Sequence, residues 1–121
     1  MMSNAEIGRI GEDIATKYLK RHGYKVIDRN FRSKRWGEID IVATKDDVLV
    51  FVEVKTREGT KHGEPVEAVT PFKLGALKRA GQYYKMEHPE APEALRIDVV
   101  SIILDPETHE PKKIELFLDA Q

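Results

Sequence analysis

Apolar residues near the start of the chain recur every three or four positions, as on one face of a helix. Ser3 and Glu6 precede this pattern with the spacing of a capping box, and Gly23 is a typical helix stop. We therefore predict an amphipathic helix between them, with Glu12 beside the apolar stripe. The apolar positions are Ile7, Ile10, Ile14, Tyr18 and Leu19.

Three strand-like segments follow, at residues 24–31, 36–44 and 48–57, separated by polar turns. Alternation in the second segment predicts Ile39, Ile41 and Ala43 on one side and Asp40 on the other. In the third segment, valines at alternate positions share one face. The other face begins with apolar residues and ends in charged ones, which predicts a strand that leaves the core as it reaches a cleft.

The second half of the chain predicts a loop, a helix and two more strands. Thr70 and Pro71 form a typical helix start, and the helix should run over 71–86. Strands are predicted at 95–104, where Asp98 interrupts an apolar run, and at 112–118. The residues expected to face the core from the helix are Phe72, Ala76, Leu77, Ala80 and Tyr84. The order α-β-β-β-α-β-β predicts an α/β fold with helices packed on a mixed sheet.

Length and composition narrow the classes of protein to consider. The 121 residues suit one domain, 1–121, and no apolar run is long enough to cross a bilayer. The N-terminal segment lacks a secretory apolar stretch, so we expect a cytoplasmic protein. Without cysteine there is no disulfide framework and no zinc–thiolate site. The histidines are scattered, at His22, His62, His88 and His109.

Charge is unevenly distributed although the net charge is only −1. Residues 1–36 carry nine basic and four acidic side chains, and the basic ones concentrate at 17–35, where Asp28 is the single acid. Such a patch would attract a phosphate backbone. The alternative interpretation is a solvated helix face followed by an exposed loop.

Three charged residues, Asp40, Glu53 and Lys55, occupy strand positions where apolar residues are expected. A two-residue hairpin loop at positions 46 and 47 would place Asp40 directly opposite Glu53. Two carboxylates this close repel each other unless a cation lies between them, and Mg²⁺ or Mn²⁺ suits such oxygen ligands. Lys55 would project from the face of Glu53.

This combination of groups is suited to phosphodiester hydrolysis. A metal ion offsets charge on the phosphate and acidifies water, and a lysine orients that water and stabilises the transition state. The alternative is an ordinary surface hairpin with Glu53 and Lys55 on a solvated face.

The pattern resembles the PD-(D/E)xK nuclease superfamily and, more closely, the YraN-type family of small proteins proposed to be endonucleases, distant relatives of archaeal Holliday junction resolvases. The resemblance spans residues 5–102. It implies a restriction-endonuclease-like α-β-β-β-α-β core, here with an extra C-terminal strand. The matching segments are G-x-x-G-E-D-I-A at 8–15, N-F-R at 30–32, G-E-I-D-I-V at 37–42, F-V-E-V-K-T-R at 51–57 and R-I-D-V-V at 96–100.

The resemblance also implies roles for individual residues. Asp40 and Glu53 would be metal ligands, joined by the backbone carbonyl of Val54, and Lys55 would be the motif lysine. Ile39 stands where the superfamily motif usually has proline. Glu12 matches a first-helix acid that approaches the metal, often through water; the alternative is a surface acid favoured by the helix dipole.

Further polar residues are candidates for supporting roles. Glu38 shares the predicted face of Asp40 and either supports the metal ligands from behind or is a solvated side chain. Asp98 is either near the site or paired with a cation such as Arg96 or Arg57. Candidate phosphate contacts, each alternatively a solvated charge, are Arg32, Arg35, Arg57, Lys73 and Lys78.

The function that this resemblance implies is a Mg²⁺- or Mn²⁺-dependent endonuclease acting on nucleic acid, DNA rather than RNA, with branched or junction-like DNA as the expected substrate. Resolvase relatives are dimers, which implies a homodimer by analogy. The alternative function is a nucleic-acid-binding module on a nuclease fold with little turnover.

Overall fold

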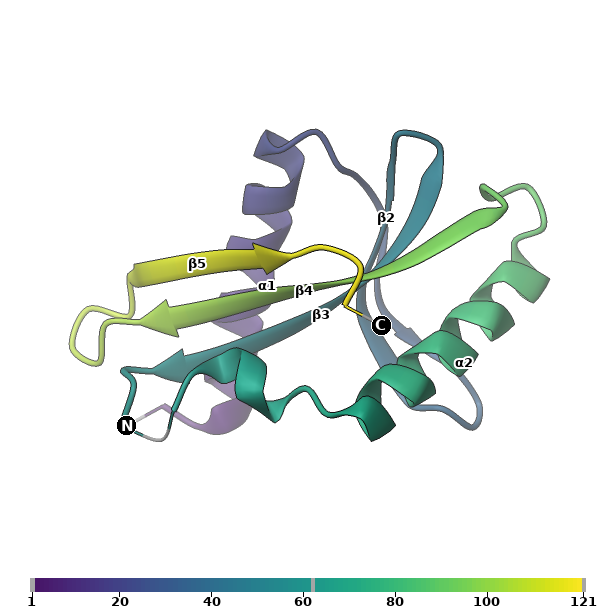
Figure 1. Cartoon of the computed structure of the whole chain (residues 1–121). Coiled ribbons are helices and arrows are strands. Elements are labelled where there is room, and N and C mark those ends of the chain that lie inside the picture. The colour runs from purple at the N-terminus through teal and green to yellow at the C-terminus, as the bar shows by residue number, and fades with distance from the viewer. Residues whose placement is uncertain (1, 62, 121) are drawn as a thin grey trace.

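A computed structural model describes residues 2–61 and 63–120 of the chain; His62 lies outside the described residues. Two helices and five strands form an α+β fold in the predicted order, and the loop before the second helix contains a short 3₁₀ helix (Figure 1). The elements are α1 (Asn4–Arg21), β1 (Lys25–Arg32), β2 (Glu38–Lys45), β3 (Val48–Glu58), η1 (Pro65–Ala68), α2 (Pro71–Glu87), β4 (Ala94–Leu104) and β5 (Pro111–Phe117). Neither α-helix has the length and apolar character needed to cross a membrane within the described residues.

The strands form one mixed sheet in the order β1-β2-β3-β4-β5. Neighbouring strands are antiparallel except β3 and β4, which are parallel and are connected through η1 and α2. A parallel pair requires such a crossover, and α2 supplies most of it. The element order α1-β1-β2-β3-α2-β4 is the core that the resemblance implied, with β5 as the added strand.

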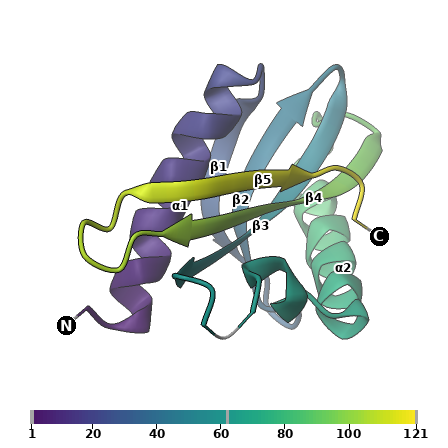
Figure 2. The same ribbon diagram turned by 60° about the vertical axis from the view of Figure 1, so that its left-hand side comes forward.

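The helices pack against opposite faces of the sheet, so the molecule has two cores (Figures 1 and 2). On β3, Val50 and Val52 face α1 while Leu49 and Phe51 face α2, which confirms the alternation expected for this strand. Ser3 begins α1 with the predicted capping box, and Gly23 follows its end with a φ of 86°.

Two sequence-based expectations about core residues are wrong. Phe72, expected to face the core, is 87% exposed in the first turn of α2, whereas Leu77, Ala80 and Tyr84 are buried. Ile39, expected on the face of Ile41, instead packs in the core under α2.

The change of face at Ile39 has a local cause in the neighbouring strand. Asn30 of β1 has a φ of 53° and lies between the pairs Arg29–Ile41 and Phe31–Ile39. A residue in the left-handed region breaks the regular pleat of a strand. Phe31 accordingly packs in the same core as Ile39.

Helix α1 crosses β3 closely at Gly11, where there is no room for a side chain. A Cβ atom at Gly11 would lie 1.8 Å from Oγ1 and 2.8 Å from Cβ of Thr56. Gly8, one turn earlier, has no atom within 4 Å of the place where its Cβ would lie. The first glycine of the G-x-x-G motif therefore faces open space, and the second allows the helix to contact the strand.

We predict that Gly11→Ala and Gly8→Ala change stability in opposite directions. The clash with Thr56 should lower the free energy of unfolding of Gly11→Ala by about 1–3 kcal/mol, since overpacking outweighs the better helix propensity of alanine. Gly8→Ala gains that propensity without a clash and should be more stable by about 0.5–1 kcal/mol. Urea unfolding measures both, and equal stability of the two variants would contradict the close approach at Gly11.

Candidate metal centre

The hairpin of β2 and β3 has the register expected from the sequence. Asp46 and Asp47 form the two-residue loop, both with positive φ, as a type I′ turn requires. Lys45 pairs with Val48, and the ladder continues as far as Ile41 and Val52. The same register carried one residue further places Asp40 opposite Glu53.

Asp40 takes over a hydrogen bond at the point where this ladder ends. Its Oδ2 atom accepts a hydrogen bond of 2.8 Å from the Val54 backbone N–H. In a continued ladder, Val54 would pair with the backbone of Ile39, which has turned to the other face. The side chain of Asp40 is thereby fixed against β3, beside Glu53.

The carboxyl group of the partly buried Asp40 lies within hydrogen-bonding reach of the buried Glu53 carboxyl group. Glu53 is 2% exposed. Burial, followed by the neighbouring negative charge of Glu53, raises the pKa of Asp40 to about 7, and the Val54 N–H and the Lys73 ammonium only partly oppose this rise. An added positive charge close to these two carboxyl groups would therefore stabilise the protein.

Two lysines from different elements reach the same oxygen of this pair. The Nζ atom of Lys55, on β3, lies 3.8 Å from Oε2 of Glu53, and that of Lys73, in the first turn of α2, lies 3.5 Å from it. Both side chains keep more than a third of their surface exposed, so each ammonium group is accessible to a bound anion. The sequence suggested Lys73 as a phosphate contact but did not place it beside Glu53.

Glu12 lies near this pair, on α1, but bonds to a different partner. Its Oε1 atom accepts a hydrogen bond of 2.8 Å from the side-chain amide of Asn30, which also donates one of 3.1 Å to Glu38. Burial raises the pKa of Glu12, and the negative charges of Asp40 and Glu38 add to the rise. Asn30 thus holds two acids beside the candidate centre. Sequence reasoning missed this role, although the unusual position of an asparagine within a strand was a signal.

The donor set fits a divalent ion held by two carboxylates and water. Within residues 2–61 and 63–120, no three acidic or histidine side chains are gathered as a metal site, and the approach of Glu12 to a metal ion stays a prediction. Mg²⁺ commonly binds through one or two carboxylates and keeps several waters. The Val54 carbonyl leaves the strand at the same edge as its N–H, which faces Asp40, and its role as a ligand stays a prediction.

Asp98 belongs to a separate structural network and is not part of this centre. Its fully buried carboxylate accepts hydrogen bonds from Nε and Nη2 of Arg96, at 2.9 Å each, from the Tyr24 hydroxyl at 2.8 Å and from the Asp119 N–H at 3.0 Å. Of the two alternatives for Asp98, the structure shows the pairing with Arg96. Burial and Asp98 together raise the pKa of Tyr24 to about 12.

The remaining basic candidates lie at different places around the sheet. Arg32 donates a hydrogen bond of 3.2 Å to Glu38. The guanidinium carbon of Arg35 lies 5.8 Å from the centre of the Trp36 ring, which Arg79 also approaches. Lys78 lines a pocket of about 260 Å³ beside Arg96, apart from the Asp40–Glu53 pair. Arg57 lines a larger pocket that Lys55 also borders. Nucleic-acid contacts of these residues stay predictions.

We predict that Asp40→Asn is more stable than the natural protein at pH 8 in the presence of EDTA. A carboxyl group whose folded pKa lies above its unfolded value binds extra protons in the folded state, so its stabilisation is lost as the pH rises from about 4 to about 7. Asparagine still accepts the Val54 N–H and removes the repulsion. Urea unfolding at pH 5 and pH 8 measures the effect, and an identical pH response of both proteins would contradict it.

Comparisons with known proteins identify relatives over most of the chain. A family model described as "Uncharacterised protein family UPF0102" matches residues 11–102. The UPF0102 protein of Syntrophomonas wolfei is 49% identical over 102 residues, covering 84% of this chain and 88% of the relative. The UPF0102 protein of Caldicellulosiruptor bescii is 42% identical over 120 residues, covering 98% of this chain and 99% of the relative.

One solved structure, described as the crystal structure of a repair endonuclease from Pyrococcus abyssi, matches with a TM-score of 0.43 and 20% sequence identity. The match covers 88% of this chain but only 39% of that one, so the chain spans well under half the length of that protein. The matched residues and the identities to curated relatives settle the predicted YraN-type resemblance: this chain belongs to the uncharacterised protein family UPF0102.

Proposed function

We propose that this protein is a Mg²⁺- or Mn²⁺-dependent endonuclease that hydrolyses phosphodiester bonds in DNA, with branched or junction-like DNA as its substrate. The observation that carries the proposal is the close approach of the partly buried Asp40 carboxyl group to the buried one of Glu53, with two lysine ammonium groups beside them. A structural role for this arrangement is disfavoured, because two carboxyl groups placed together in a buried position destabilise the fold.

The two carboxylates would hold the metal ion, and Glu12 would approach it through water. A divalent ion bound there would supply Lewis acidity toward a phosphate oxygen and lower the pKa of a water molecule. The ion also offsets the repulsion between the two acids, which provides the physical reason for placing them side by side.

The lysines supply the charge that a phosphate requires. Lys55 is positioned by the same strand as Glu53, so its ammonium group can orient the attacking water and stabilise the negative charge of the transition state. Lys73 comes from the first turn of α2 and approaches Glu53 from another element. An anionic substrate would draw both ammonium groups away from Glu53 toward the phosphate.

We predict that activity requires the carboxylate pair and Lys55. Asp40→Asn, Glu53→Gln and Lys55→Met should each lower the rate of Mn²⁺-dependent cleavage of a four-way DNA junction by at least about 100-fold, because each removes a metal ligand or a charge from the reaction centre. The rate is measured by gel electrophoresis of labelled junctions with Mn²⁺, Mg²⁺ or EDTA.

The matched control for these variants is Glu107→Gln, which removes an exposed acid from the turn between β4 and β5. Its cleavage rate should equal that of the natural protein. Circular dichroism checks that all variants are folded. Binding of the junction without cleavage by any divalent ion would replace the proposal with the alternative of a binding module. Metal-dependent cleavage that survives all three substitutions would place the activity elsewhere.

A further inference from the structure

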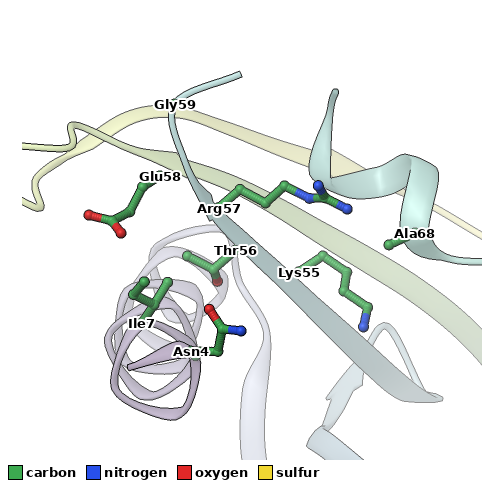
Figure 3. Close-up of a pocket in the computed structure, with 9 residues that line it drawn as sticks. Asn4, Ile7, Lys55, Thr56, Arg57, Glu58, Gly59 and Ala68 are labelled. Atoms are coloured by element: carbon green, nitrogen blue, oxygen red, sulfur yellow. The ribbon is translucent and has the colours of Figure 1, made fainter. Parts of the chain in front are cut away.

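A pocket in the described part of the chain borders the candidate centre through Lys55. It has a volume of about 480 Å³ and lies between the start of α1, the end of β3 and η1 (Figure 3). Arg57 lines it from β3, and Gly8 lines it from α1. The function proposed above makes no use of this pocket.

The pocket extends around an open edge of the sheet. Figure 3 shows Lys55 and Arg57 extending from one side of β3 and Thr56 and Glu58 from the other, yet all four line the same pocket. The edge of β3 toward β4 is paired through Glu58, whereas its ladder with β2 ends at Val52. The space therefore lies along the C-terminal part of β3, at the edge that faces β2.

The alternation of backbone groups along β3 directs one N–H group toward the pocket. Successive N–H groups of a strand alternate between its two edges, and the Val54 N–H faces β2, where it bonds to Asp40. The Thr56 N–H, two residues on, therefore also faces the open edge and the pocket. A backbone N–H beside basic side chains is a typical phosphate-binding arrangement.

The charge and size of the pocket favour a single nucleotide. Lys55 and Arg57 project from the same side of the strand. The Glu58 carboxylate is engaged elsewhere, because it accepts a hydrogen bond of 2.9 Å from His109. The pocket is within the range of roughly 300–1,000 Å³ that holds one small ligand, and a double helix does not fit in it. An extended peptide could also pair with a strand edge, but two basic side chains favour a phosphate.

We propose that this pocket binds one unpaired nucleotide of a DNA strand, with its phosphate between Lys55, Arg57 and the Thr56 N–H. The inference rests on the proposed function, since Lys55 joins the pocket to the Asp40–Glu53 pair. It refines the substrate: the bound strand must be single-stranded next to the phosphate that is cleaved, as it is at a flap, a frayed end or a branch point.

Gly8 offers a way to fill the pocket without altering its charge. Its missing Cβ faces open space, so the side chain of Gly8→Phe can enter the pocket while the helix is retained. In EDTA, where no cleavage occurs, we expect Gly8→Phe to weaken binding of a fluorescein-labelled oligothymidylate by about tenfold and to leave binding of a blunt duplex unchanged. Fluorescence anisotropy measures both affinities, and circular dichroism checks the fold.

A charge variant tests the same pocket independently of Gly8. Arg57→Gln should weaken single-strand binding and reduce the slope of log affinity against log salt concentration by about 0.7, the value for one phosphate contact on a single strand. Lys112→Gln removes the same charge from an exposed position in β5, outside the basic stretch at 17–35, and should leave the slope unchanged. This pair of variants remains informative if Gly8→Phe does not fold.

The inference is overturned if folded Gly8→Phe binds the oligothymidylate as the natural protein does, or if it loses single-strand and duplex binding equally. Equal salt slopes for Arg57→Gln and the natural protein would also overturn it. An extended peptide paired with the strand edge would then be the better candidate ligand. If the pocket variants behave as expected while the natural protein cleaves no DNA with any divalent ion, the nuclease proposal fails and the nucleotide pocket stands.

Discussion

The repulsion between two carboxyl groups is the constraint on which the site depends. Asp40, which is partly buried, lies beside the buried Glu53, and burial together with this neighbouring acid disfavours the charged form of Asp40. Lys55 and Lys73 both approach Glu53, and the Val54 N–H bonds to Asp40, yet the pKa of Asp40 still rises to about 7. A fold that keeps two acids so close together gives up stability at this position, as functional sites often do.

The site forms because the ladder between β2 and β3 stops at a defined residue. Up to Ile41 and Val52 the strands exchange backbone hydrogen bonds, and beyond that point the Asp40 side chain takes the Val54 N–H. The end of the ladder also exposes the edge of β3 that borders the large pocket. One structural feature thus places the two acids and opens the space beside Lys55.

The sequence predicted the parts of this arrangement that follow from local rules. The Asp46-Asp47 turn and the period of two fixed the hairpin register, so the position of Asp40 opposite Glu53 could be anticipated. The face of Ile39 could not, because it depends on a left-handed residue, Asn30, in a neighbouring strand. The exposure of Phe72 was missed for a related reason: helical period gives a stripe of residues but not where the sheet beneath it ends.

The contacts that complete the site come from elements distant in sequence, and this explains the rest of what pattern reasoning missed. Lys73 reaches Glu53 only because α2 crosses from β3 back to β4, with its first turn beside Glu53. Helix α1 lies close enough to β3 only because Gly11 has no side chain to meet Thr56. The same approach that places Glu12 near Asp40 leaves Gly8 facing the pocket. The glycine motif therefore sets the distance between α1 and β3, and with it the position of an acid and the width of the space beside Lys55.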